Sequence, residues 1–129
     1  MTKKSQIISG IGIDIVDIKR IKKAVETTSF LKRFFTPSEI KYCLAGKNKF
    51  ERIAARFAAK EAVIKATGLK KLPLKDIALI KDKSGKPSIR IRDKKYSDLN
   101  VLISLSHTTD YACASVIVIK DRKIGGLED

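Results

Sequence analysis

The sequence predicts a mixed fold that combines a run of helices with pairs of antiparallel strands. Residues 18–67 contain stretches of helical periodicity with clear start and stop signals, and residues 76–120 fit two strand pairs joined by turns. A further strand, residues 6–17, precedes the helices. With 129 residues, 43% of them hydrophobic, and no low-complexity linker, the chain is expected to form a single domain over residues 1–129.

The predicted strand at residues 6–17 has two chemically different faces. One face carries Ile7, Ser9, Ile11, Ile13 and Ile15, and the other carries Ile8, Gly10, Gly12, Asp14 and Val16. Glycine weakens a strand unless a helix, another backbone or a ligand must approach closely, so we expect such an approach on the Asp14 face. Because the third glycine of a dinucleotide fingerprint is absent, a nucleotide-binding Rossmann fold is not predicted. Residues 1–5 are expected to form a short, dispensable N-terminal extension before the strand.

Helices are predicted in three places before Gly68. Residues 18–27 fit a short amphipathic helix with a basic outer side. The segment Thr36-Pro37-Ser38-Glu39 has the form of a capping box with proline at the first helical position, so a helix should begin there and end at Gly46. The longest helix should run from about Lys49 to Thr67, where Gly68 supplies its C-terminal cap.

Glu61 lies within the apolar stripe of this longest helix. It follows Phe57 by four residues and precedes Ile64 by three, so all three side chains point to the same side. A carboxylate placed there must become neutral, meet a cation or bind a metal, because burying it unpaired is costly. An internal ion pair is the simplest interpretation, with Lys65 in the favourable i,i+4 position and Lys60 on the flank of the stripe.

Two hairpins are predicted in the last part of the chain. Residues 76–81 and 88–92 flank a turn that contains Gly85, and residues 100–106 and 111–120 flank a segment that begins at His107. His107 is the only histidine, and it fits either turn chemistry or phosphate binding together with lysines of the longest helix. A Ser-His nucleophile pair is disfavoured, because Ser106 is adjacent and its side chain is expected on the opposite strand face.

The formal net charge of +14, from 28 basic and 14 acidic residues, predicts an anionic partner. A phosphorylated small molecule, an acidic protein, a membrane surface and nucleic acid all satisfy this condition. Nucleic acid ranks second, because the chain has no Trp, 6% aromatic residues and no aromatic-rich strand on which bases would stack.

The cysteine spacing and the apolar runs limit the compartment. Cys43 and Cys113 have neither zinc-ligand nor disulfide-scaffold spacing, and they are interpreted as thiols in a reducing environment. The longest apolar run is interrupted by Asp14 and Asp17 and is too short to span a membrane. We therefore expect a cytoplasmic protein that does not bind membranes.

Two carboxylates, Asp14 and Glu61, stand where a purely structural role is awkward, and lysines accompany them. Oxygen ligands favour Mg²⁺, which is usually held by one or two carboxylates together with substrate phosphates. The sequence therefore predicts a metal-assisted phosphate site.

Four separated motifs resemble the holo-[acyl-carrier-protein] synthases, the small type of 4′-phosphopantetheinyl transferase. These motifs are Gly10-Ile11-Gly12-Ile13-Asp14-Ile15-Val16, Arg56-Phe57-Ala58-Ala59-Lys60-Glu61-Ala62-Val63-Ile64-Lys65, Gly85-Lys86-Pro87 and Leu105-Ser106-His107-Thr108. They occur in the family's order and cover nearly the whole chain. The resemblance implies an α+β fold, with one long helix packed on a curved antiparallel sheet, and a homotrimer with active sites at the subunit interfaces.

The resemblance also implies the reaction. The phosphopantetheine arm of coenzyme A would move to a serine of an apo acyl carrier protein for fatty acid biosynthesis, releasing adenosine 3′,5′-bisphosphate. Asp14 and Glu61 match the family's Mg²⁺ ligands, and Lys65 would stabilise the same phosphate oxygens. The serine proton would pass to Glu61 or to a water on the metal, and the sequence leaves this choice open.

Further contacts follow from the same resemblance. Arg56, Lys60 and His107 are candidates for the remaining phosphates of coenzyme A. The carrier protein is strongly acidic, so the basic helix after Asp14 is its expected docking surface, led by Arg20 with Lys23 nearby. Carrier domains of polyketide or peptide synthases remain an alternative substrate, and a basic RNA- or DNA-binding module remains an alternative function.

Overall fold

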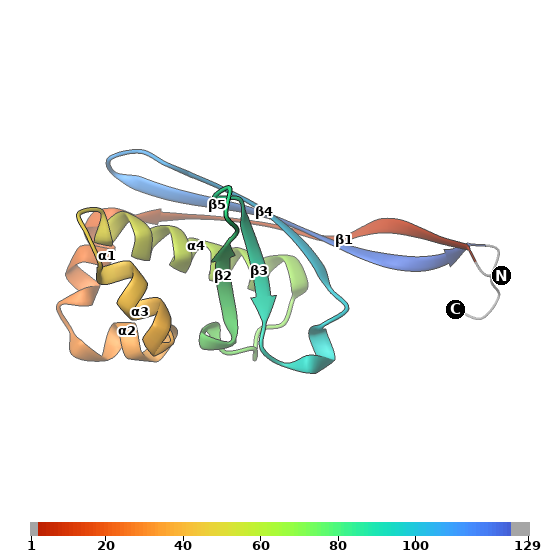
Figure 1. The fold of residues 1–129 in the computed structure, drawn as a ribbon, viewed down its shortest axis with the longest axis horizontal. Coiled ribbons are helices and arrows are strands. Elements are labelled where there is room, and N and C mark those ends of the chain that lie inside the picture. The colour runs from red at the N-terminus through yellow and green to blue at the C-terminus, as the bar shows by residue number, and fades with distance from the viewer. Residues whose placement is uncertain (1–2, 125–129) are drawn as a thin grey trace.

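The computed structural model describes residues 3–124 and has the expected α+β architecture (Figure 1). Its elements in chain order are β1 (Lys3–Asp17), α1 (Ile18–Val25), α2 (Thr28–Phe34), α3 (Pro37–Leu44), α4 (Lys49–Thr67), β2 (Ile77–Lys81), β3 (Pro87–Ile91), β4 (Asn100–His107) and β5 (Tyr111–Ile124). Single 3₁₀ turns precede β2 and β4. The strands form a three-stranded antiparallel sheet in the order β1-β5-β4 and a separate antiparallel pair, β2-β3.

Helix α4 lies along one face of the three-stranded sheet and supplies much of the core (Figure 1). Small residues make this contact close: α4 buries five of its six alanines, and β5 buries Ala112 and Ala114. The expected close approach to β1 is confirmed. A Cβ atom on Gly10 would lie 1.8 Å from the carbonyl oxygen of Ala66, so only glycine fits there.

The first strand is longer than predicted. At Ser9 the alternation of its side chains between the two faces of the sheet shifts by one residue. Lys3, Lys4 and Ser5 pair with the end of β5, so the described part of the expected extension, residues 3–5, belongs to the sheet. The register between β1 and β5 shifts between Ile8 and Gly10 because Ser9 forms a β-bulge. The predicted alternation is therefore wrong before the bulge, and Ile8 lies exposed like the later isoleucines.

The outer face of the sheet is apolar and uncovered by any described element. Its exposed side chains include Ile11, Ile13 and Ile15 of β1, each at least 61% exposed, together with Leu102 of β4 and Tyr111 of β5. An exposed apolar surface of this kind is typical of a protein–protein interface.

The helix boundaries illustrate both success and failure of the sequence prediction. The capping box is present at α3, where Thr36 N donates to Glu39 Oε1 at 2.9 Å and Glu39 N to Thr36 Oγ1 at 3.3 Å. Gly68 ends α4 with φ of 72°, in the left-handed conformation expected of a glycine cap.

Helix α2 was not predicted, and its signal was the apolar triplet Phe30, Leu31 and Phe34. Phe30 and Phe34 pack on Phe57 of α4, with ring centroids 5.5 and 5.6 Å from it.

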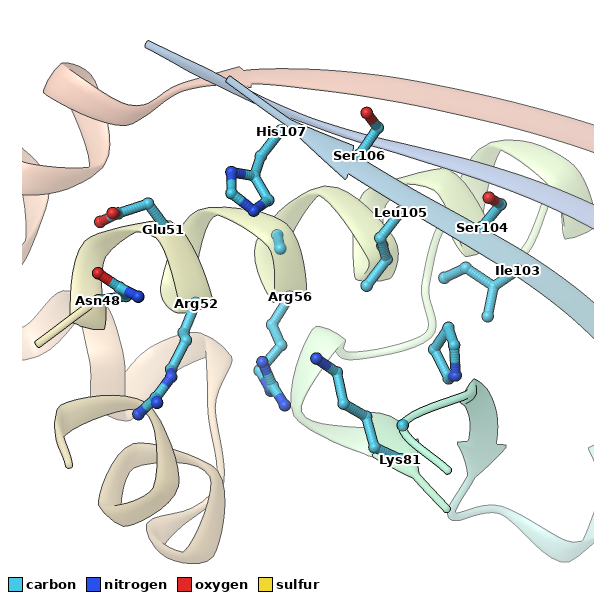
Figure 2. Close-up of a pocket in the computed structure, with 13 residues that line it drawn as sticks. Asn48, Glu51, Arg52, Arg56, Lys81, Ile103, Ser104, Leu105, Ser106 and His107 are labelled. Carbon is cyan, nitrogen blue, oxygen red and sulfur yellow. The ribbon is translucent and has the colours of Figure 1, made fainter. Parts of the chain in front are cut away.

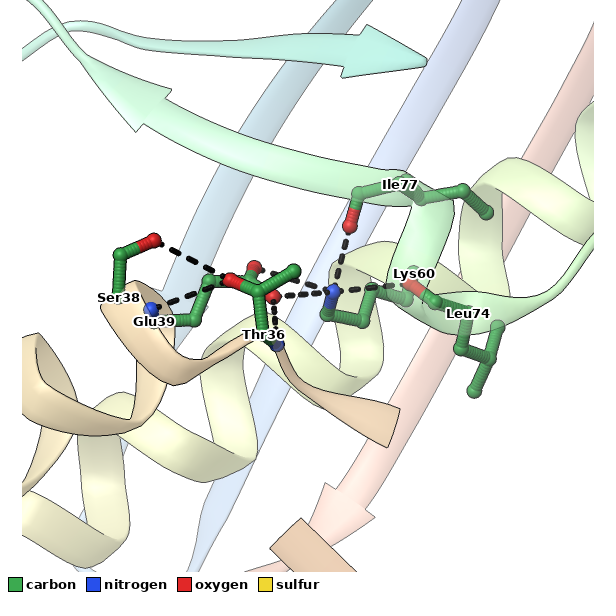
Figure 3. A network of polar contacts seen from close by, with 6 residues as sticks. All are labelled: Thr36, Ser38, Glu39, Lys60, Leu74 and Ile77. Atoms are coloured by element: carbon green, nitrogen blue, oxygen red, sulfur yellow. Dashed lines mark hydrogen bonds and ion pairs between the residues drawn. The ribbon is translucent and has the colours of Figure 1, made fainter. Parts of the chain in front are cut away.

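A buried ion pair joins α3 to α4, and its lysine also bonds to the 3₁₀ turn before β2 and to the first residue of β2 (Figure 3). Lys60 is fully buried, and its Nζ donates to Glu39 Oε1 at 3.0 Å and to the carbonyl oxygens of Leu74 and Ile77. Glu39 Oε2 also lies 3.0 Å from Nζ, but without hydrogen-bond geometry. Burial lowers the pKa of Lys60, and the Glu39 carboxylate opposes that shift.

Two further expectations concern cysteines and membranes. Cys43 and Cys113 are both free thiols, as the spacing predicted, and burial raises the pKa of Cys43. Among the described helices, none combines the length and the hydropathy that crossing a membrane requires.

Candidate functional site

Asp14, Glu61 and Lys65 come together where the C-terminal part of β1 meets the second half of α4. Lys65 Nζ lies 3.0 Å from Asp14 Oδ1 and donates a second bond of 3.0 Å to the carbonyl oxygen of Ile13. The predicted partner of Lys65 was Glu61, one helical turn away. The structure corrects this prediction, because the lysine reaches across to β1 instead.

Glu61 is half-buried beside these two groups. Burial raises its pKa, the Asp14 carboxylate raises it further, and Lys65 opposes both effects. Two carboxylates that interact in this way form an oxygen-rich, negatively charged site that suits a hard cation such as Mg²⁺. Within residues 3–124 no third histidine, cysteine or acidic side chain joins them, so substrate oxygens or water would complete the coordination of a metal held there.

A cleft of about 390 Å³ opens beside the two carboxylates. We call it the carboxylate cleft, and its walls include Asp14, Asp17, Arg20, Ile21, Phe57 and Glu61. Arg20, predicted to contact the carrier protein, thus lies on the same cleft as the predicted metal ligands. Lys23 is exposed on α1 outside the lining of the cleft.

A second hollow, which we call the basic cavity, has a volume of about 420 Å³ and lies between α4, β4 and the β2-β3 hairpin (Figure 2). Its cationic lining consists of Arg52, Arg56 and Lys81, with His107 at its upper edge in Figure 2. Gly85 and Pro87 of the third motif, and Leu105 of the fourth, also line it. Motifs that are far apart in the sequence therefore meet in one cavity.

The structure places the three predicted phosphate contacts differently. Arg56 and His107 both line the basic cavity, but the lysines of α4 expected to act with His107 do not. Lys60 is enclosed in the core, where Glu39 and two carbonyl oxygens occupy its ammonium group. Its role in this structure is to hold elements together, because a buried and paired lysine has no donor left for a ligand.

Sequence reasoning missed two cations of the basic cavity, Arg52 and Lys81. Lys81 ends β2 just before the turn that carries Gly85, so its position beside the glycine motif was the available signal. Arg52 lies one turn before Arg56 on α4, on the same side of the helix. Its Nη1 also donates to the carbonyl oxygens of Tyr42 and Ala45, which caps the end of α3.

His107 ends β4, and its ring points toward α4 and the cavity, whereas Ser106 points away from it (Figure 2). This orientation agrees with the expectation that the two residues do not form a nucleophile and base. The neighbouring turn is held by Thr108, whose Oγ1 accepts from Asp110 N at 3.2 Å and Tyr111 N at 3.1 Å.

The carboxylate cleft and the basic cavity share no lining residue. Glu61 and Arg56 lie about 140° apart around α4, because successive helical residues advance by about 100°. An acidic and a basic side chain, each predicted to bind a ligand, therefore lie on different sides of one helix.

Comparison with known proteins gives a consistent result. Residues 10–116 match the model of the 4′-phosphopantetheinyl transferase superfamily. The holo-[acyl-carrier-protein] synthase of Clostridium tetani is 46% identical in an alignment of 121 residues, and the match covers 87% of this chain and 96% of that protein.

Solved structures agree with this match. The holo-[acyl-carrier-protein] synthase of Helicobacter pylori in complex with coenzyme A has a TM-score of 0.74 and 40% identity, over 84% of this chain and 98% of that one. The Bacillus anthracis holo-(acyl-carrier-protein) synthase, in complex with CoA (3′,5′-ADP), has a TM-score of 0.77 and 36% identity, over 88% and 97% of the two chains.

Proposed function

Because this chain belongs to the 4′-phosphopantetheinyl transferase superfamily, we propose that it transfers the 4′-phosphopantetheine arm of coenzyme A to a serine of apo acyl carrier protein. The serine oxygen forms a bond to the β-phosphorus of coenzyme A, and the bond from that phosphorus to the bridging oxygen breaks. The products are holo-carrier protein and adenosine 3′,5′-bisphosphate. The observation that carries this assignment is the meeting of Asp14, Glu61 and Lys65 where β1 packs on α4.

Asp14 and Glu61 are the residues that would hold Mg²⁺. The metal, when bound, neutralises negative charge on the diphosphate and so favours departure of the leaving phosphate. Lys65 is partly exposed, and its Nζ lies 3.0 Å from Asp14 Oδ1, which places a solvent-accessible cation next to the same oxygens. We assign it the stabilisation of charge that develops on the phosphate during transfer.

Glu61 or a water on the metal is the proposed acceptor of the serine proton. Burial and the Asp14 charge raise the pKa of Glu61, whereas a bound cation would lower it and make the carboxylate a weaker base. Arg20, on the wall of the same cleft, and the exposed Lys23 are the proposed docking contacts for the acidic carrier. Such rim charges mainly raise the rate of encounter and orient the carrier toward the cleft.

The proposed active site lies between neighbouring copies of a homotrimer. Two observations support this arrangement: the outer face of the sheet is apolar and exposed, and the basic cavity and the carboxylate cleft lie on different sides of α4. We propose that coenzyme A spans the cleft of one copy and the cavity of the next, with its diphosphate at Asp14 and Glu61 and with Arg56 and His107 contacting a remaining phosphate in the cavity. The free cysteines suit a reducing compartment, and we place the reaction in the cytoplasm.

Intact-protein mass spectrometry tests this function. Apo acyl carrier protein is incubated with the protein, coenzyme A and Mg²⁺, and a parallel sample contains EDTA. We expect the carrier to gain the mass of one phosphopantetheine arm, and we expect EDTA to abolish the gain. If the mass of the carrier does not increase, although a known transferase modifies the same carrier, the proposal is refuted. If only a carrier domain of a polyketide or peptide synthase increases in mass, the substrate is reassigned to that class.

A further inference from the structure

Arg56 is a buried cation whose charge has no carboxylate partner within residues 3–124. The residue is 5% exposed, and it takes part in none of the ion pairs or side-chain hydrogen bonds of the described chain. The buried acid of this region, Glu39, is committed to Lys60. Arg56 and Lys60 are also close enough for the positive charge of Arg56 to contribute to the lowered pKa of Lys60. None of its nitrogens is both enclosed and without a partner, so the guanidinium reaches the open space of the cavity while the rest of the side chain is buried.

Tyr42 supplies a stabilising contact to this cation. The Arg56 guanidinium carbon lies 4.4 Å from the centroid of the Tyr42 ring, within the range of a favourable cation–π interaction. A contact with the ring face uses none of the N–H donors of the guanidinium, so they stay available to an anion. Arg56 lines the basic cavity, and Figure 2 shows its side chain between those of Arg52 and Lys81.

The Tyr42 ring is itself held in place from α4. Arg52 Nη1 donates to the carbonyl oxygens of Tyr42, at 3.4 Å, and Ala45, and the Arg52 guanidinium carbon lies 5.3 Å from the Tyr42 ring centroid. Tyr42 therefore sits at the end of α3 between a backbone clamp and the Arg56 side chain. The ring does not line the basic cavity, so it acts on a ligand there through the two lining arginines that contact it, Arg56 at 4.4 Å and Arg52 at 5.3 Å from the ring centroid.

We infer that Tyr42 is a positioning residue that holds the Arg56 guanidinium in the basic cavity, ready to receive a phosphate of coenzyme A. This inference rests on the proposed function. It extends the site to α3, an element that carries none of the four sequence motifs. Without the ring, Arg56 keeps its charge but loses its fixed orientation, so binding of the anion becomes weaker while the reacting groups around Asp14 stay unchanged.

The test compares Tyr42→Leu, which removes the ring, with Tyr42→Phe, which keeps the ring and removes the hydroxyl. Tyr96→Leu is the matched control, because it removes the ring beneath Lys95, 5.4 Å from that ammonium nitrogen and outside the basic cavity. We measure kcat and the KM for coenzyme A in the transfer assay, the Kd of coenzyme A by calorimetry and the Tm of each variant. For Tyr42→Leu we expect KM and Kd to rise roughly fivefold or more, with kcat within about twofold of the unmodified protein.

The variants separate a positioning role from a structural one. Raised KM and Kd in Tyr42→Leu, with near-normal values in Tyr42→Phe and Tyr96→Leu, support the inference, since they assign the effect to the Tyr42 ring and not to its hydroxyl or to the loss of any tyrosine ring. An unchanged KM in Tyr42→Leu overturns it. Equal impairment of Tyr42→Phe and Tyr42→Leu, or a loss in Tyr42→Leu that follows Tm and kcat, overturns it as well. Absence of transfer by the unmodified protein instead contradicts the proposed function, which distinguishes the two failures.

Discussion

The backbone of Gly12 lies directly against the carbonyl oxygen of Ala62. A Cβ atom on residue 12 would come within 2.0 Å of that oxygen and 2.8 Å of the Ala66 nitrogen. Both obstructing atoms belong to the backbone of α4, which cannot move aside as a flexible side chain can. This contact fixes how close α4 lies to β1, and therefore how Asp14, two residues further along β1, meets Glu61 and Lys65.

Gly12→Ala should accordingly destabilise the protein and damage the site. We expect the free energy of unfolding, measured by urea denaturation, to fall by about 3 kcal/mol or more. Gly68→Ala is the control, because Gly68 has open space around it and only its positive φ opposes a side chain, at about 1–2 kcal/mol. If Gly12→Ala proved no more harmful than Gly68→Ala, the close approach would not hold in solution.

Lys60→Met tests the buried ion pair. Removing the ammonium group leaves the Glu39 carboxylate buried without its cation, and a broken buried pair costs about 3–5 kcal/mol. Unfolding at equal protein concentration should report that loss. The double variant Lys60→Met with Glu39→Gln should recover part of it, because no uncompensated charge remains. A phosphate-binding lysine would behave differently: its loss would raise the KM for coenzyme A and leave stability unchanged.

The glycines of β1 and the caps of α3 and α4 could be predicted because local physics decides them. A glycine in a strand indicates close approach, and a capping box specifies a helix start almost independently of the rest of the fold. The partners of Lys60 and Lys65 could not be predicted in this way. Both lysines bind groups far away in the sequence, so the arrangement of α3, β1 and the chain before β2 determines which carboxylate each one meets.

The basic cavity shows the same limit. The sequence identified Arg56, Gly85 and His107 as separate motif members, but only the packing of the β2-β3 hairpin beside β4 brings them together. Lys81 and Arg52 escaped notice because an exposed cation in a chain with 28 basic residues carries little information by itself. The bulge at Ser9 was also hidden, since no side chain in that stretch marks it.

Asp14→Ala and Glu61→Ala should each lower the rate of transfer by at least about 100-fold. Neither side chain fills the core, so circular dichroism and Tm should stay close to those of the unmodified protein. Mg²⁺ should raise the Tm of the unmodified protein by binding the folded state, and this rise should be lost in both variants. Near-normal turnover by either purified variant would contradict the assignment of metal ligands.

Ile13→Glu should disrupt self-association. Ile13 is 61% exposed in the single chain and stands between Ile11 and Ile15 on the outer face of the sheet. A carboxylate there would be buried without a partner if copies of the chain meet on this face. Light scattering coupled to size-exclusion chromatography should show a trimer for the unmodified protein and a monomer for the variant. Leu44→Glu, at an exposed apolar position on α3, should remain trimeric.

Glu61 should make the stability of the folded protein depend on pH in a definable direction. Its pKa in the folded state lies above the ordinary value of 4.5, because burial and the Asp14 charge disfavour the ionised form. As the pH rises through 4.5, the unfolded chain releases this proton before the folded one does, so the free energy of unfolding falls until the folded pKa is passed. Glu61→Gln removes this contribution. Between pH 4 and 7, urea denaturation should therefore show that the free energy of unfolding of the unmodified protein falls relative to that of Glu61→Gln. A difference between the two free energies that does not change with pH would place Glu61 in an environment like that of water.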